Sequence, residues 1–341
     1  MRLGFNPHKD EPQQESDCFH QVVVPVYIPN EEGYFKDSFV ILQYCLQSLF
    51  KTSHQKTYFT IVNNGSCDEV VDYLNSLYHK KKIQELIHST NIGKLNAILK
   101  GLTGNQFTLI TIADADVLFV NNWQEETYAV FEAFPNAGAV CPVPVFRKHF
   151  HLTSNIWFKY LFSKKLYFRA VKNVPALTKF AASIGWPWLD EKWSDTIGTL
   201  EASNGKIAVL GCSHFVATYK REVFQELPKE NSKFKLGGDS EHLYTDFPVI
   251  KSGGYRLSTY DNYAYHLGNQ MEPWMIEMYH SLIEVSKKEN TYLKFAVLKR
   301  NRLEYLFSEY LFKKILYFKP IKRILLKSKG LTPTQINNFT S

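Results

Sequence analysis

The chain has 341 residues, a formal net charge of +7 and an aromatic content of 15%. This length allows a sizeable core, in one large domain with additions or in two domains. The five cysteines are scattered without a Cys-x-x-Cys pair, which argues against a disulfide framework or a thiolate zinc site and fits a reducing cytoplasm. Residues 1–17 lack the apolar core of a signal peptide, and no run approaches the roughly 18 apolar residues of a spanning helix. We therefore expect a cytoplasmic protein that is not integral to a membrane.

Apolar strand patterns alternate with helical patterns through the first 145 residues. We expect buried strands at 21–29, 58–62, 83–88, 107–113 and 139–145, and helices at 38–51, 68–78 and 92–101. This alternation predicts an α/β fold with a doubly wound, largely parallel sheet. Residues 146–205 interrupt it with aromatic and basic side chains, and a shorter α/β stretch resumes at 206–268.

The strand at 107–113 ends on two carboxylates, Asp114 and Asp116. In an extended chain, residues i and i+2 project to the same side, so both carboxylates can converge on one point. Open α/β sheets bind ligands at the carboxyl ends of their parallel strands. Two hard oxygen ligands there suit Mg²⁺ or Mn²⁺ and hence a diphosphate. We interpret this turn as a site for a metal-bound nucleotide; the alternative is a solvated loop after a strand.

Seven short motifs follow one another along the chain in the order seen in a known family. They are Val-Pro-Val-Tyr-Ile-Pro-Asn at 24–30, Ile-Val-Asn-Asn-Gly-Ser at 61–66, Asn-Ile-Gly-Lys-Leu-Asn-Ala at 91–97, Ile-Ala-Asp-Ala-Asp at 112–116, Gly-Gly-Asp-Ser-Glu at 237–241, Ser-Gly-Gly-Tyr-Arg at 252–256 and Tyr-Ala-Tyr-His-Leu-Gly at 263–268. In this order the chain resembles the inverting glycosyltransferases of family 2, which have the Rossmann-like GT-A fold. The resemblance is good over about 20–145, fair over 206–268 and absent elsewhere.

The resemblance implies transfer of one sugar, with inversion, from a nucleotide-sugar donor to a hydroxyl of a glycan or a lipid-linked acceptor. It implies a divalent metal, Mn²⁺ or Mg²⁺, and favours a UDP-sugar. Asp116 would bind the metal directly, Asp114 would contact the ribose or a metal-bound water, and His266 would complete the metal site. The donor-binding residues carried over from the motifs are Pro25, Tyr27, Asn30, Asn63, Asn64, Ser66, Asn91, Lys94 and Asp114.

The acceptor hydroxyl must lose its proton as it attacks, so a carboxylate is expected on the side opposite the diphosphate. Asp239 and Glu241 are the catalytic candidates, and we favour Asp239. The family usually has an acidic pair here, whereas this chain has Asp-Ser-Glu. No Gln-x-x-Arg-Trp signature of processive synthases follows His266, which favours a single addition.

The expected organisation is a polar segment at 1–19, a catalytic domain at 20–268 and a helical basic extension at 269–341. Within the catalytic domain, 20–145 is the donor-binding half, 146–205 a variable insertion, and 206–268 the acceptor half.

The net charge is concentrated near the carboxyl end. Residues 292–330 carry eleven Lys or Arg against Glu304 and Glu309, whereas the rest of the chain is near neutral. Apolar side chains at Leu303, Leu306, Phe307, Tyr310 and Leu311 have helical spacing. Basic, aromatic and aliphatic residues together are typical of a segment that lies on an anionic membrane surface. The alternative is a helix that packs on the catalytic domain with a solvated basic face.

We therefore predict a peripheral protein on the inner face of the plasma membrane, and the composition suggests bacterial surface-polysaccharide synthesis. A nucleotidyltransferase is an alternative, but it would carry a Gly-rich loop after the first strand, where this chain has Pro25 to Pro29. A non-catalytic protein of the same fold would have the same pattern of strands and helices, and a membrane- or nucleic-acid-binding module would use the basic tail. We expect no nucleic-acid partner, because the charge is confined to one amphipathic segment without a known module.

Overall fold

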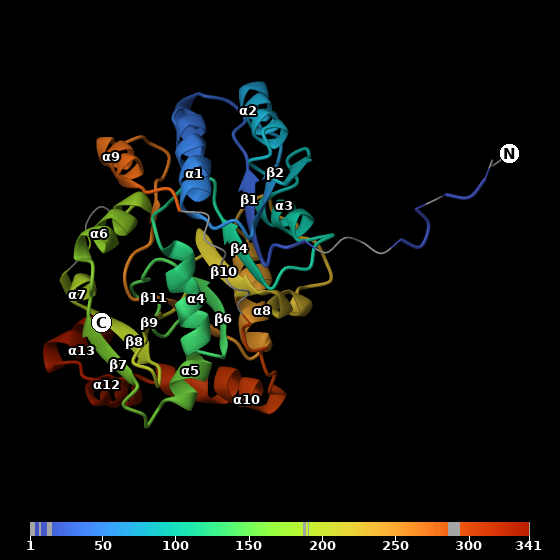
Figure 1. Ribbon diagram of the computed structural model, residues 1–341. Helices are drawn as coiled ribbons and strands as arrows, with labels where there is room; N and C mark the ends of the chain where they lie inside the picture. The colour runs from blue at the N-terminus through green and yellow to red at the C-terminus, as the bar shows by residue number, and fades with distance from the viewer. Residues whose placement is uncertain are drawn as a thin grey trace.

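The computed structural model describes residues 4–6, 8–11, 16–186, 189, 191–285 and 294–340. Its described residues form a ten-stranded sheet in the order β3-β2-β1-β4-β10-β6-β11-β9-β8-β7, flanked by helices (Figure 1). A separate two-stranded ribbon pairs β5 with β12. The α/β class predicted from the sequence is confirmed.

The first half of the sheet is parallel. Strand β1 lies between β2 and β4 and is parallel to both, and β3 is parallel to β2 at the edge. The elements of this half are β1 His20–Val26, η1 Gly33–Phe35, α1 Ser38–Thr52, β2 Thr57–Asn63, α2 Asp68–His79, β3 Glu85–His88, α3 Lys94–Gly101 and β4 Leu109–Ala113. Strands β1 and β4 are buried throughout, as expected for parallel strands with both faces covered. The carboxyl ends of β1, β2 and β4 consequently open at the same edge.

The second half of the sheet is mixed. Strand β10 is antiparallel to both β4 and β6, and β6 is parallel to β11. Its elements are α4 Trp123–Ala133, β6 Ala137–Cys141, β9 Ile207–Leu210, β10 Val216–Lys220, η2 Arg221–Glu226, η3 His242–Asp246, α8 Phe247–Lys251 and β11 Tyr255–Thr259. Because β10 is antiparallel to β4, it begins beside the carboxyl end of β4. There the backbone N–H of Asp114 donates to Phe215 O at 2.7 Å.

The insertion at 146–205 extends the same sheet. Strands β7 and β8 pair antiparallel with each other, and β8 pairs antiparallel with β9. The elements of the insertion are α5 Ser154–Lys159, β7 Leu166–Ala170, α6 Val174–Ser183, α7 Glu191–Ser194 and β8 Thr196–Glu201.

The ribbon of β5 Val117–Phe119 and β12 Ala264–His266 connects the segment after β4 with the segment after β11. In its register His266 lies opposite Val117, and the Leu267 N–H donates to Asp116 O at 2.8 Å. This pairing brings His266 to the turn that follows β4.

The carboxyl-terminal segment packs in two places. Helix α9 Pro273–Ser281 lies against α1 and the β5–β12 ribbon, where Met275 is buried with Ile41, Leu118 and Leu267. The second half of the sheet is contacted by the later elements, which are α10 Arg302–Leu306, the π-helical η4 Phe307–Phe312, α11 Lys313–Tyr317, α12 Lys319–Ser328 and α13 Pro333–Thr340. Phe312, Leu316 and Leu326 are buried in one apolar cluster with Trp157 and Leu257. Helices α10, α12 and α13 lie at the end of the molecule away from α1 and α2 (Figure 1). No helix among the described residues combines the length and apolar character needed to cross a bilayer.

Candidate active site

A cavity of about 490 Å³ opens at the carboxyl ends of β1 and β4. Its walls come from six segments that are separated in the sequence. The lining residues are Pro25, Val26, Tyr27, Ile28, Tyr34, Phe35, Ser38, Ile41, Asn64, Asn91, Lys94, Asp114, Ala115, Asp116, Lys235, Leu236, Gly268 and Asn269. The edge where the parallel strands end therefore forms a pocket large enough for a small ligand.

Asp114 and Asp116 lie in the turn between β4 and β5, at the wall of this cavity. The strand ends at Ala113, so the two carboxylates are in a turn and face different partners. Asp114 pairs with Lys94, whereas Asp116 faces His266, whose Nε2 is 3.5 Å from Asp116 Oδ2.

Asp116 and His266 have the donor atoms and the free positions that a divalent cation requires. Asp116 Oδ1 and His266 Nδ1 are buried, and neither has a hydrogen-bond partner among the described residues. Burial raises the pKa of Asp116, His266 partly offsets this, and the nearby Asp114 adds to it. A cation at this position would lower the pKa of Asp116 again, because it favours the ionised carboxylate. The residues present fit Mn²⁺ or Mg²⁺.

Lys94 connects two acidic residues at the cavity wall. Its Nζ lies 2.8 Å from Asp114 Oδ1 and 2.7 Å from Glu241 Oε1. Burial would lower the pKa of Lys94, but the two carboxylates outweigh this and raise it, so the ammonium is charged. A charged donor at the amino end of α3 is suited to bind phosphate oxygens.

The position of Lys94 depends on the glycine before it. Gly93 has φ +89°, and a Cβ at this position would lie 2.8 Å from Phe234 O and 2.9 Å from Lys235 Cα. The Lys94 N–H donates to Lys235 O at 2.9 Å. The absent side chain thus allows the loop at 234–236 to close against the start of α3.

Glu241 is held by a chain of ion pairs that extends into the protein. Its Oε2 lies 3.3 Å from His214 Nδ1, and His214 Nε2 lies 2.8 Å from Asp246 Oδ2. Asp246 is 1% exposed, and its Oδ1 lies 2.5 Å from Arg256 Nη2. Burial alone would lower the pKa of His214, but its hydrogen bonds to Asp246 and Glu241 raise it to about 9. The hydrogen bond from His214 and the charge of Lys94 lower the pKa of Glu241 to about 2.

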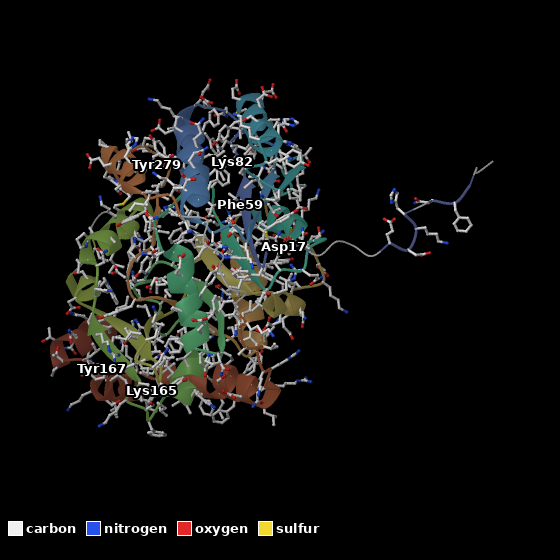
Figure 2. The ribbon with its side chains drawn as sticks, in the orientation of Figure 1. Asp17, Phe59, Lys82, Lys165, Tyr167 and Tyr279 are labelled. Atoms are coloured by element: carbon white, nitrogen blue, oxygen red, sulfur yellow. The ribbon has the colours of Figure 1, made fainter. Side chains whose placement is uncertain are left out.

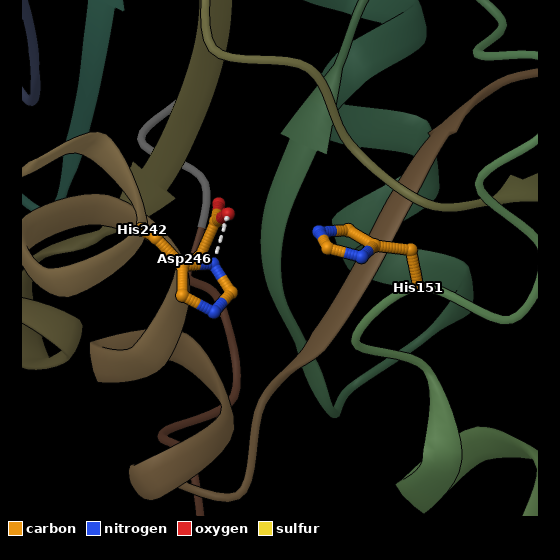
Figure 3. Close-up of side chains that lie close together, drawn as sticks. All are labelled: His151, His242 and Asp246. Carbon is orange, nitrogen blue, oxygen red and sulfur yellow. Dashed lines mark hydrogen bonds and ion pairs between the residues drawn. The ribbon is translucent and has the colours of Figure 1, made fainter. Parts of the chain in front are cut away.

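His151, His242 and Asp246 form a second group of potential metal ligands (Figure 3). Asp246 Oδ2 accepts from His242 Nδ1 at 3.2 Å, while its other oxygen pairs with Arg256. Burial, Lys148 and Arg256 lower the pKa of His151 to about 4. With Arg256, Lys148 and a charged His214 beside it, this group has an electropositive environment that disfavours a cation. We assign it to the ion-pair network.

Asp239 lies in a different environment from Glu241. It is exposed, and Gly237, Gly238 and Asp239 are consecutive left-handed residues with φ of 78°, 59° and 59°. Ser240, the next residue, is buried and hydrogen-bonds to Ser232 Oγ at 2.9 Å. The turn thus presents one acid to solvent while the other points into the ion-pair network.

The loops after β1 and β2 separate the predicted donor-binding residues into two groups. Pro25, Tyr27, Asn64 and Asn91 line the cavity together with Lys94 and Asp114. Asn63, Ser66 and Asn30 do not line it, and their side chains bond to backbone groups: Asn63 Oδ1 accepts from Ser66 N at 3.0 Å, Ser66 Oγ from Ile28 N at 3.1 Å, and Asn30 Oδ1 from Glu32 N at 3.0 Å. These three side chains shape the loops that carry the lining residues.

Several lining residues were not predicted from the sequence. The rings of Tyr34 and Phe35 pack edge to face with centroids 5.2 Å apart, and those of Phe35 and Tyr27 do so at 6.0 Å. Aromatic rings therefore form one wall of the cavity. An aromatic pair shortly after Pro29-Asn30 was an available signal for them. Leu236 and Asn269 come from distant segments without a local pattern. His214, which bonds to Glu241 but does not line the cavity, is not among the candidates named from the sequence.

Comparison with known proteins identifies the family of the chain. A family model described as "Glycosyl transferase family 2" matches residues 22–228, well over half of the chain. The chain therefore belongs to this family and is a glycosyltransferase with a GT-A, Rossmann-like fold. No curated protein sequence matches the chain significantly.

Two solved structures resemble the chain at low identity. The mannosyltransferase PcManGT from Pyrobaculum calidifontis, in complex with GDP-Man and Mn²⁺, is 17% identical with a TM-score of 0.40; the match covers 74% of this chain and 59% of that one. TarS 1-349 from S. aureus is 11% identical with a TM-score of 0.41, and the match covers 94% of this chain and 69% of that one. This chain thus spans about three fifths of the length of the mannosyltransferase, and the family assignment rests on the family model.

Proposed function

We propose that the protein transfers one sugar, with inversion, from a nucleotide-sugar donor to a hydroxyl of a glycan or lipid-linked acceptor, in a metal-dependent reaction. One observation carries this proposal: Asp114 and Asp116 border the 490 Å³ cavity, with His266 3.5 Å from Asp116 and free buried donor atoms on both partners. A solvated loop would not require a half-buried imidazole beside a half-buried carboxylate, each with one buried atom that lacks a hydrogen-bond partner in the described part of the chain.

The residues around the cavity have complementary roles in donor binding. Asp116 and His266 would hold the cation, with Asp114 beside them to accept from the ribose or from a cation-bound water. The cation supplies Lewis-acid stabilisation of the charge that develops on the departing diphosphate. Lys94 would exchange its bond to Asp114 for a bond to a phosphate oxygen, while Glu241 keeps its ammonium in place. The aromatic wall of Tyr27, Tyr34 and Phe35 offers flat surfaces for the nucleobase.

Asp239 is our choice for the base that accepts the proton of the acceptor hydroxyl. Both oxygens of Glu241 are engaged, by Lys94 and by His214, and its pKa of about 2 makes it a weak base. The carboxylate of Asp239 is exposed and belongs to a turn whose residues Gly238 and Ser240 line a second cavity of about 430 Å³. Asp239 itself lines neither cavity, so an acceptor bound beside this turn would reach its carboxylate from the solvent side and leave the Lys94–Glu241 pair intact.

The deciding experiment is nucleotide release from UDP-, GDP-, dTDP- and CMP-sugars with Mn²⁺, Mg²⁺ or EDTA. We favour a UDP-sugar. The proposal is supported if one donor slowly releases its nucleotide, if this release requires the cation, and if Asp116→Ala abolishes it. Release from no donor, together with no cation-dependent change in melting temperature with any nucleotide, overturns it.

We propose that the reaction takes place on the cytoplasmic side of the plasma membrane, in the synthesis of a bacterial surface polysaccharide. Residues 20–268 would form the catalytic domain, and the basic extension at 269–341 would hold it at the anionic membrane surface. The basic excess of residues 292–330 supports this arrangement, because anionic lipids attract clustered Lys and Arg.

A further inference from the structure

The helical segment from Arg302 to Tyr317 has two apolar sides. The inner side packs on the protein, whereas the residues of the outer side are all at least 40% exposed, although Phe307 on that side also contacts Phe158, with ring centroids 5.0 Å apart. The inner side contains Ser308, Phe312 and Leu316, which are spaced four residues apart and buried. Phe312 contacts Phe158 of α5 at 5.4 Å. The predicted apolar stripe, Leu303, Leu306, Phe307, Tyr310 and Leu311, is on the other side. Ile315 is exposed as well, and we call these six residues the outer stripe.

The outer stripe is exposed along its whole length. Leu303 is 80% exposed, Tyr310 62% and Leu311 52%. Further along the chain, Phe318 and Ile324 are exposed as well. Contiguous apolar surface of this kind marks an interaction site, because single exposed apolar residues are common and rows of them are not.

Exposed basic residues accompany the outer stripe, and exposed acidic residues do not. Arg302, Lys314, Lys319, Arg323 and Lys327 are exposed. Neither of the two acidic side chains between Leu298 and Gly330 is exposed. Glu304 is half-buried, and the side chain of Glu309 is 7% exposed and faces Lys313. The surface therefore combines an apolar row with uncompensated positive charge.

A turn of the insertion lies at the end of α12, the helix that follows the outer stripe in the chain. The turn after α5 carries Phe162, which is 96% exposed, and the exposed Lys164 and Lys165. Lys329 Nζ donates to Tyr160 O at 3.1 Å and to Ser163 O at 2.8 Å, which fixes the turn to the end of α12. Lys165 and Tyr167 lie at the end of the molecule away from Phe59 and Tyr279 (Figure 2).

We infer that the outer stripe and the turn at Phe162 together form one membrane-binding face, whose apolar side chains enter the headgroup region of an anionic bilayer. This inference rests on the proposed peripheral function and deepens it, because it assigns the contact to a defined face built from the tail and the insertion. The apolar row supplies hydrophobic insertion, and the lysines and arginines beside it pair with anionic headgroups.

Charge complementarity favours a bilayer over a second copy of the chain. Two copies of this face would bring basic residues against basic residues without acids to pair with them. An anionic bilayer matches both properties at once, and its fluid surface can accept a row of side chains of unequal length.

The test is sedimentation of the full chain with vesicles of phosphatidylcholine alone or with 30% phosphatidylglycerol, in low and high salt. We expect binding to the anionic vesicles, weakened by salt. The double variant Leu303→Glu with Leu311→Glu should reduce partition about tenfold or more, because it places two charges at the interface. The matched control carries Tyr78→Glu with Ile276→Glu, two exposed apolar positions on α2 and α9, and should bind like the wild type.

A spectroscopic readout locates the contact. No tryptophan lies between Leu298 and Ser341, so Leu311→Trp introduces a reporter into the outer stripe. Its emission should shift to shorter wavelength on anionic vesicles and be quenched by brominated acyl chains, and Ile276→Trp should do neither. Sedimentation equilibrium of the wild type and the Glu variant at matched melting temperature tests self-association.

Equal vesicle binding by the wild type and the outer-stripe variant overturns the inference, as does absence of binding to anionic vesicles. A dimer that the outer-stripe variant abolishes, without vesicle binding, would assign this face to a second copy instead. Nucleotide release in the absence of vesicles should be the same in the wild type and the variant. Failure of membrane binding is thereby separated from failure of the proposed transferase activity.

Discussion

At the residue scale, the two acids of the 237–241 turn differ through their partners. Glu241 is bonded at both oxygens, to Lys94 at 2.7 Å and to His214 at 3.3 Å, whereas Asp239 is exposed. Asp-x-Glu in the sequence could not separate these roles, because Lys94 and His214 are 147 and 27 residues away from Glu241. The same two carboxylates consequently support different functions, one in proton transfer and one in orienting a phosphate ligand.

Substitution of each acid should therefore change a different kinetic constant. Asp239→Asn should lower kcat by roughly 10²–10⁴-fold with little change in the KM for the donor, because it removes the base. Glu241→Gln should mainly raise the KM for the donor, because Lys94 loses its second anchor. Steady-state kinetics with the preferred donor and a glycan acceptor measure both. A large kcat loss in Glu241→Gln with normal kcat in Asp239→Asn would reverse our assignment.

His214 should make the stability of the protein depend on pH. Its pKa in the folded protein is about 9, above the ordinary 6.5, because Asp246 and Glu241 bond the charged ring while Arg256 opposes it. The stabilisation is complete below about pH 6.5 and is lost as the pH rises through about 9. Urea unfolding at pH 6, 7.5 and 9.5 should show the wild type losing roughly 1–3 kcal/mol more than His214→Asn. The exposed His79→Asn serves as control, and parallel pH profiles for wild type and His214→Asn would contradict the expectation.

At the scale of elements, the start of α3 and the loop at 234–236 are interdependent. The loop can approach only because Gly93 has no side chain, and its carbonyl at Lys235 accepts the Lys94 N–H. Helix α3 itself follows from the periodic Leu95, Ile98 and Leu102, but its contact with a loop 140 residues later does not. Local patterns predict elements, whereas the loop contact arises from the order of strands in the sheet.

Gly93→Ala should disrupt this contact. Its Cβ would meet backbone atoms at 2.8 and 2.9 Å, so the 234–236 loop has to move away from the cavity. Gly104 is the matched control, because its φ of +82° is similar to the +89° of Gly93 but nothing lies within 4 Å of its Cβ. Gly104→Ala should cost about 1–2 kcal/mol from backbone conformation alone. Gly93→Ala should cost more and also weaken nucleotide binding, as measured by chemical denaturation and calorimetric titration; equal effects of the two variants would contradict this.

At the scale of the whole molecule, the tail is both a structural part and an exposed surface. The sequence left two interpretations open, membrane contact or packing on the catalytic domain. In the structure Leu316 and Leu326 are buried in the same cluster as Leu257 of β11, while Leu303 is 80% exposed. The side chains that pack on the domain, Leu316 of α11 and Leu326 of α12, are therefore not those of the apolar stripe that the sequence predicted.

Leucine substitutions in the tail should therefore differ according to position. Leu326→Ala should lower the free energy of unfolding by about 2–5 kcal/mol, because it leaves a cavity in the core. Leu303→Ala should change it by less than about 0.5 kcal/mol. Urea denaturation of the full chain measures both, and a small effect at Leu326 would show that the tail contributes little to the folded domain.

The sequence alone predicted the α/β class, the strands and helices of the first 145 residues other than β5 and α4, and the acids after β4. These depend on hydrophobic periodicity and on chain-local turns, which a single sequence records directly. Only the tertiary structure decided which distant groups meet: His266 with Asp116 through the β5–β12 register, Lys94 with Glu241, and His214 with Asp246. It also decided which side of the tail helix faces outward. Such contacts depend on strand order, register and the competition between apolar faces for a limited core, and none of these is written in local periodicity.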